Sequence, residues 1–166
     1  GLAYSYGKNR KHGGILAKDA VSKLLSDVPL VNYTAFDLNS LQELQDIIGD
    51  MPMVLDDDYI DINPLWKKEK KIVINRDNVE EFVRSRNTSK DYSNKTRMQR
   101  QKLYIQTYIN QLKTQLTNDY STTLQKMYNF YSKLTTNITL KEIDSYAEMI
   151  LNYSIDNNEY YTLPGE

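Results

Sequence analysis

The stretch 77–116 constrains the fold of this 166-residue chain more than any other part of the sequence. Residues 77–83 can form about two helical turns, and the polar residues 87–89 that follow are typical of a loop. Apolar residues then recur at helical spacing and predict a long helix with these residues as its buried stripe: Met98, Ile105, Ile109, Leu112 and Leu116. We expect Ser93 or Asn94 to cap this helix.

Four polar side chains in this stretch have the chemistry of one anion-binding site: Arg84, Arg86, Arg97 and Gln101. Arg84 and Arg86 are two residues apart, so they share a face where the chain is extended after the short helix. Arg97 and Gln101 are four apart and share a face of the long helix. Guanidinium groups form forked hydrogen bonds with phosphate oxygens, so the set suits a diphosphate. The alternative is that these arginines are solvated or paired with nearby acids.

Arg100 points nearly opposite the apolar stripe, and we expect it to be solvated. Tyr104 and Tyr108 lie at the edge of the stripe, and the tyrosines of the chain are interpreted mainly as core residues. Two Ser/Thr-x-x-Glu patterns indicate helix starts: Ser40 with Glu43, and Thr139 with Glu142. Gly49 is expected to end the first of these helices.

Helical and strand patterns alternate along the chain, which favours an α/β layer structure. We expect helices at 15–27, 40–48, 124–134 and 140–151, and strands at 31–36, 51–55, 72–75 and 159–163. The sequence therefore predicts a single domain over residues 1–166. Its expected architecture is an α-β-α layered domain with a central mixed sheet and a mostly helical C-terminal half.

Composition narrows the function classes. The net charge is −1, which does not favour a generic nucleic-acid binder. The chain has no Cys, which excludes disulfides and Cys-ligated metal sites. His12 is the only histidine, so a Ser–His–Asp enzyme is improbable. No apolar run approaches the roughly 20 residues of a membrane-spanning helix.

Two features between the predicted strands have more than one interpretation. The acidic segment LDDDYIDIN at 55–63 lacks the Gly and the final Glu of a calcium loop, and we expect a solvated loop. Trp66 is followed by four lysines at 67, 68, 70 and 71. It could bind sugar phosphates or nucleic acid among them, or lie as a tryptophan at the rim of the domain.

The arginine pattern resembles the signature of the LytR–CpsA–Psr family, the enzymes that attach glycopolymers to the bacterial cell wall. The residues that carry the resemblance are VRSR, with Arg84 and Arg86, and RMQRQ, with Arg97, Arg100 and Gln101. LAYSYG at 2–7, the segment from Ala17 to Met53 and the closing TLPGE are also similar to the family. The chain departs from the family pattern at Asn94, where an Asp is frequent, and lacks a Gly near Arg76.

The resemblance implies a phosphotransferase that moves a teichoic acid or capsule polymer from polyprenyl diphosphate to peptidoglycan. It assigns Arg84, Arg86, Arg97 and Gln101 to diphosphate binding and assigns no catalytic base and no metal ligand in this chain. It implies Mg²⁺ on upstream strands and a membrane anchor, both outside this sequence, and a place at the extracellular face of the cell membrane. We expect the match to begin inside the family domain, so that this piece alone is incomplete or inactive, and we expect no nucleic-acid partner.

Two alternatives remain open. One is a non-catalytic domain of the same fold that binds polyprenyl phosphate or acts as a scaffold. The other is a nucleic-acid-binding regulator that uses KTRMQRQK at 95–102 as a basic helix.

Overall fold

The computed structural model describes residues 12–35, 37, 39–89 and 93–152. Its elements, in chain order, are α2 Gly13–Leu24, β1 Thr34–Ala35, α3 Asn39–Ile48, β2 Met51–Val54, β3 Lys71–Ile74, α4 Val79–Arg84, α5 Ser93–Asn118, α6 Tyr120–Tyr131, β4 Thr135–Thr136 and α7 Leu140–Asn152. This arrangement confirms a mixed α/β chain whose C-terminal half is mostly helical. The predicted strand at 159–163 and the LAYSYG and TLPGE segments lie outside the described residues.

The strands of the described part form two small sheets. β1 pairs with β4 and β2 pairs with β3, and both pairs are antiparallel. The single central mixed sheet that the sequence predicts is therefore replaced, within these residues, by two separate two-stranded sheets. Each strand is only two to four residues long, so each offers few backbone groups for further pairing.

Side chains bond the backbone next to β1, which explains why the expected strand at 31–36 is short. The amide of Tyr33 donates to Oδ1 of Asn137 at 2.8 Å, and Nδ2 of Asn137 donates to the carbonyl of Val31 at 3.0 Å. Nδ2 of Asn32 donates to the hydroxyl of Tyr146 in α7 at 2.6 Å. These bonds fasten the β1 segment to the C-terminal helices in place of a longer strand ladder.

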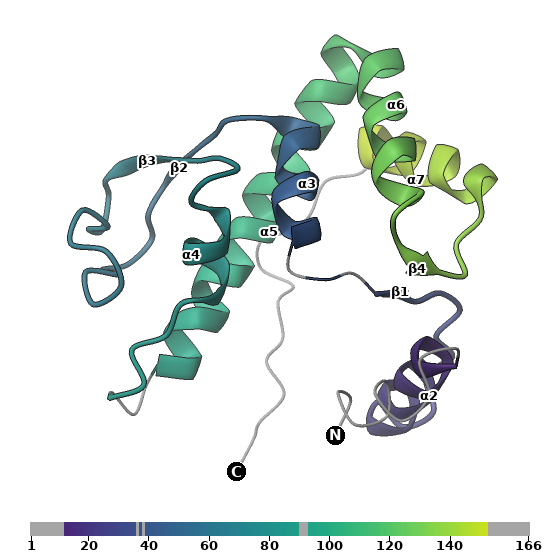
Figure 1. The fold of residues 1–166 in the computed structure, drawn as a ribbon, viewed down its shortest axis with the longest axis horizontal. Helices are drawn as coiled ribbons and strands as arrows, with labels where there is room; N and C mark the ends of the chain where they lie inside the picture. The colour runs from purple at the N-terminus through teal and green to yellow at the C-terminus, as the bar shows by residue number, and fades with distance from the viewer. Residues whose placement is uncertain (1–11, 36, 38, 90–92, 153–166) are drawn as a thin grey trace.

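Helix α5 runs through the middle of the molecule, and α3, α4, α6 and α7 pack against it (Figure 1). Its buried ridge has a spacing of four residues: Arg100, Tyr104, Tyr108, Leu112 and Leu116. The predicted stripe is right at Leu112 and Leu116 but wrong at Met98 and Ile105, which are each 43% exposed. The two tyrosines predicted at the edge of the stripe lie in the core.

Polar bonds join α5 to α3 inside the core. The hydroxyl of Tyr104 donates to Oε1 of the buried Gln45 at 2.9 Å, and the hydroxyl of Tyr108 donates to the carbonyl of Leu44 at 2.9 Å. Nε2 of Gln45 donates to the carbonyl of Gly49 at 2.7 Å. Burial raises the pKa of both tyrosine hydroxyls, so they remain donors at neutral pH. The tyrosine ridge is therefore structural, as the sequence predicts.

The starts of two helices differ from each other in how well the sequence predicts them. The capping box at α7 is confirmed, since the amide of Thr139 donates to Oε2 of Glu142 at 2.7 Å and the amide of Glu142 to Oγ1 of Thr139 at 3.4 Å. The box predicted at α3 is wrong. There, Oδ1 of Asp37 accepts from the amide and the hydroxyl of Ser40, both at 2.9 Å.

Helix α2 lies beside β1 and away from α5 (Figure 1). Several of its large apolar side chains are exposed, with Leu24 at 69% and Ile15 at 43%. Gly14 is packed so closely on the ring of Tyr33 that an added Cβ would overlap it. Among the residues that the structure describes, no helix is long and apolar enough to cross a membrane.

Candidate functional site

The end of α4 and the first turns of α5 are held together by three side-chain hydrogen bonds. Nε of Arg100 donates to the carbonyl of Phe82 at 2.8 Å, and its Nη2 donates to the carbonyl of Ser85. Nε2 of Gln101 donates to the carbonyl of Val83 at 3.1 Å. The structure therefore places the VRSR segment against the helix that carries Arg97 and Gln101.

Arg84 and Arg86 lie on either side of the helix end. Arg84 is the last residue of α4 and forms an exposed ion pair with Glu80, one turn back in the same helix. Ser85 is extended, with φ −59° and ψ 143°, and Arg86 follows it on the surface. The predicted change from helix to extended chain at this point is confirmed, and Arg84 has the acidic partner that the alternative interpretation expects.

Arg97 is half-buried in the first turns of α5. Its Nη2 donates to Oδ1 of Asn94 at 2.8 Å, while its Nε is buried without a hydrogen-bond partner among the described residues. Ser93 and Asn94 both lie inside α5, so neither is the residue that precedes the helix as a cap. Asn94 instead orients the guanidinium of Arg97.

The prediction that Arg100 is solvated is wrong. Its side chain is fully buried on the ridge of α5, and its guanidinium carbon lies 5.4 Å from the centre of the Tyr59 ring. Burial lowers the pKa of Arg100, and the charges of Tyr59 and Asp61 act in the opposite direction. Nη1 has no hydrogen-bond partner among the described residues. The burial of Arg100 was not predicted because the buried stripe was assigned from apolar residues alone. An arginine does not count toward such a stripe, although Arg100 lies four residues before Tyr104.

The segment between β2 and β3 is only partly a solvated loop. Asp56, Asp57 and Asp58 are exposed, as the sequence predicts, but Tyr59 is fully buried. Trp66 is 4% exposed, so the prediction of a rim or ligand-binding tryptophan is wrong.

Both aromatic residues of this segment pack on α4. The rings of Tyr59 and Trp66 meet the ring of Phe82 edge to face, with centroids 6.4 Å and 5.1 Å apart. The amide of Tyr59 donates to the carbonyl of Trp66 at 2.8 Å, which closes the segment on itself. The segment between β2 and β3 is therefore anchored to the helix that ends at Arg84.

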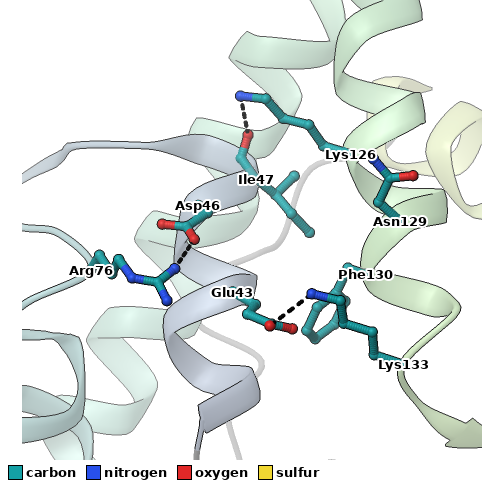
Figure 2. Close-up of a pocket in the computed structure, with 8 residues that line it drawn as sticks. All are labelled: Glu43, Asp46, Ile47, Arg76, Lys126, Asn129, Phe130 and Lys133. Atoms are coloured by element: carbon teal, nitrogen blue, oxygen red, sulfur yellow. Dashed lines mark hydrogen bonds and ion pairs between the residues drawn. The ribbon is translucent and has the colours of Figure 1, made fainter.

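A hollow of about 320 Å³ lies between α3 and α6 (Figure 2). Its cations already have acceptors: Arg76 pairs with Asp46, Lys133 pairs with Glu43, and Lys126 reaches a backbone carbonyl of α3. Glu43 and Asp46 line the same hollow, so an anion entering it would also meet two carboxylates. The hollow is thus a weaker candidate for a diphosphate than the arginines of α4 and α5.

The sequence analysis did not single out this hollow, although a signal for it exists. Four of its lining residues, three in α6 and Lys133 just after that helix, recur at intervals of one to four residues: Lys126, Asn129, Phe130 and Lys133. The residues that line the hollow from α3 and after β3 show no comparable spacing in the sequence. The sequence therefore does not predict the hollow.

The described residues contain no group of three or more His, Asp or Glu side chains that could hold a metal ion. The candidate site has the opposite character, because its chemistry comes from the guanidinium groups of Arg84, Arg86 and Arg97 and the amide of Gln101. Such groups bind anions and are not metal ligands.

A sequence model of the LytR_cpsA_psr family matches residues 2–166. No curated protein sequence matches the chain.

Solved structures share the fold. TagV of B. subtilis has a TM-score of 0.70 at 14% identity, covering 92% of this chain and 57% of TagV. Lin1025 of Listeria innocua has a TM-score of 0.68 at 22% identity, covering 90% of this chain and 60% of Lin1025. A structure of TagT bound to LI-WTA has a TM-score of 0.63 at 16% identity, covering 90% of this chain and 54% of TagT. The chain therefore spans 54% to 60% of each of these relatives.

Proposed function

The chain belongs to the LytR–CpsA–Psr family, and on that premise we propose that it forms part of a phosphotransferase of cell-wall assembly. The complete protein would move a glycopolymer of teichoic acid or capsule type from a polyprenyl diphosphate carrier to peptidoglycan. The relative TagT was solved bound to LI-WTA, which supports a glycopolymer as the class of ligand.

The observation that carries the proposal is the Nε of Arg97, which has no hydrogen-bond partner among the described residues. This N–H is buried, and Nη2 of the same guanidinium is already bonded to Asn94. An unsatisfied buried donor costs about 1–3 kcal/mol, and more when it is charged. A ligand oxygen at this position would remove that cost, and phosphate oxygens accept strongly from guanidinium groups.

The neighbouring residues can complete a diphosphate site. Gln101 fixes the carbonyl of Val83, which directly precedes Arg84. The ion pair of Arg84 with Glu80 is exposed on both sides, and such pairs contribute only about 0–1 kcal/mol. A doubly charged ligand can therefore replace Glu80 as the partner of Arg84. Arg86 has no ion-pair partner within the described part of the chain and supplies a further positive charge.

In the proposed reaction, a hydroxyl group of peptidoglycan gives its proton to solvent water, and its oxygen bonds to the phosphorus that carries the polymer. The bond from this phosphorus to the bridging oxygen breaks, and polyprenyl phosphate leaves with the additional negative charge. Arg84, Arg86 and Arg97 stabilise that charge, because fixed cations act strongly on charge that develops during phosphoryl transfer.

Mg²⁺ is part of the proposal for the complete protein, where it would supply further charge neutralisation at the diphosphate. The described residues do not fit a magnesium site, because no group of acidic side chains among them is placed to hold an ion. On the resemblance to the family, we propose metal ligands outside this sequence. The site is proposed to face the outside of the cell membrane, where a lipid-linked donor can meet peptidoglycan, with the membrane anchor also outside this sequence.

The structure offers little support for the alternative of a nucleic-acid-binding helix. Of the cations in the segment KTRMQRQK, Arg100 is fully buried and Arg97 is half-buried. A helix that binds nucleic acid needs its cations on the surface to contact phosphates.

Calorimetric titration with farnesyl diphosphate, a short soluble polyprenyl diphosphate, tests the proposal. We expect Arg97→Ala to weaken binding by about tenfold to a hundredfold, the effect of one charge-assisted hydrogen bond. The matched control is Arg76→Ala, which removes an exposed arginine from the hollow between α3 and α6. This variant should bind like the unaltered protein. An unaltered protein that does not bind, or equal losses in both variants, would refute the proposal. Binding without polymer transfer by the complete protein would favour the non-catalytic alternative.

A further inference from the structure

We infer that Arg100 is a positioning residue of the diphosphate site: its buried guanidinium fixes the backbone that carries Arg84 and Arg86. The inference rests on the proposed function and adds a residue to which the sequence assigns no role. Arg100 is not proposed to touch the diphosphate.

The geometry of the helix end carries this inference. Arg100 bonds two carbonyls, those of Phe82 and Ser85, and these lie before and after Arg84. Ser85 is the residue at which the backbone leaves α4 and becomes extended. A single rigid group on α5 therefore sets both the last turn of α4 and the direction of the chain into Arg86.

A guanidinium is suited to this task in ways that other side chains are not. Its donors form a planar fork, so two carbonyls can be bonded at a fixed separation, whereas an ammonium group is a compact point charge. The charge also lies at a helix C-terminus, where a cation is favourable. The ring of Tyr59, 5.4 Å from the guanidinium carbon, covers the group from the segment between β2 and β3.

Packing alone does not account for an arginine at this position. Arg100 continues the ridge of Tyr104 and Tyr108, and a well-packed apolar residue there is often as stable as a buried charge or more so. Its Nη1 has no hydrogen-bond partner among the described residues, which adds to the cost of burial. The two bonds to the end of α4 are what the arginine provides and an apolar residue would not.

The test is Arg100→Lys, measured by calorimetric titration of the full chain with inorganic pyrophosphate. Lysine keeps the charge but loses the fork, so we expect affinity to fall about tenfold while the protein stays folded by circular dichroism. Arg76→Lys is the matched control, because it makes the same exchange at an exposed ion pair, and it should not change affinity.

Repeating the Arg100→Lys exchange in a second variant distinguishes a positioning role from a general effect on stability. In a protein that already carries Arg84→Gln and Arg86→Gln, Arg100→Lys should weaken pyrophosphate binding little further, because the groups through which it acts are gone. Its effect on thermal unfolding should be the same in both backgrounds. Should Arg100→Lys not fold, Arg100→Gln provides the same comparison with a neutral donor and no buried charge.

Unchanged affinity in folded Arg100→Lys would overturn the inference, and so would an equal loss of affinity in both backgrounds. These results leave the proposed function intact as long as the unaltered protein binds pyrophosphate and Arg84→Gln with Arg86→Gln weakens binding. If the unaltered protein binds neither pyrophosphate nor farnesyl diphosphate, the proposed function fails first.

Discussion

Leu65 and Trp66 are adjacent in the sequence and lie in opposite environments. Leu65 is 78% exposed, while Trp66 is 4% exposed and packs edge to face on Phe82 of α4. Because Phe82 also accepts a hydrogen bond from Arg100 through its carbonyl, this contact supports the helix end at the candidate site. The segment between β2 and β3 thus contributes to the site through its anchor and not through its exposed acids.

We predict that Trp66→Ala lowers the free energy of unfolding by about 3–5 kcal/mol, the usual cost of removing a buried tryptophan side chain. Leu65→Ala is the matched control and should stay within about 0.5 kcal/mol of the unaltered protein, because its side chain is exposed. Urea unfolding followed by circular dichroism measures both. Similar losses for the two variants would show that the segment is not anchored as described.

At the residue scale, the sequence predicts the position of a side chain best where a single local pattern determines it. The i, i+4 spacing of Arg97 and Gln101 and the helix end after Arg84 follow from such patterns. The burial of Arg100 could not be predicted, because the carbonyls and the aromatic ring that compensate its charge come from α4 and from Tyr59. Tertiary partners of this kind leave no signal in the helix itself.

At the element scale, helix α7 shows how one carboxylate links two parts of the fold. Oε2 of Glu142 accepts from Thr139, and Oε1 accepts from Nδ2 of Asn32 at 3.3 Å, next to β1. The hydrogen bonds from Thr139 are the main cause that lowers the pKa of Glu142 below its ordinary value of 4.5. A lowered pKa means that the folded state favours the ionised carboxylate.

Glu142→Gln is therefore predicted to be less stable than the unaltered protein at neutral pH. The difference should be complete above pH 4.5 and should shrink as the pH falls through the lowered pKa, where the carboxylate of the folded protein takes up its proton. Thermal unfolding across this pH range measures it. Glu148→Gln makes the same charge change on the exposed face of α7 and is the control. A difference that persists unchanged well below pH 4.5 would contradict the role of the cap.

The two helix starts show why a local pattern can succeed or fail. In the Thr139 box, both partners of the pattern bond each other's amides. At α3, Asp37 supplies an ionised acceptor for Ser40, while Glu43 pairs with Lys133 at 2.7 Å. β2 and β3 lie where the sequence predicts strands, whereas β4 was not predicted, because its pairing with β1 joins residues far apart in the sequence such as Thr34 and Thr136.

At the scale of the whole molecule, α5 organises the described fold, and the candidate site lies where α4 meets its first turns (Figure 1). The α/β class and the family were predictable, because the arginine spacing and the helical periodicity are properties of the sequence. The sheet arrangement was not predictable, because strand pairing depends on residues far apart in the sequence.

The most direct measurement is a crystal structure of the protein soaked with geranyl diphosphate. The account predicts both phosphates at the junction of α4 and α5, with an oxygen within hydrogen-bond distance of Nε of Arg97 and with Arg84 turned from Glu80 toward the ligand. Phosphates bound instead by Arg76, Lys126 and Lys133 in the hollow between α3 and α6, with Arg97 unchanged, would contradict it.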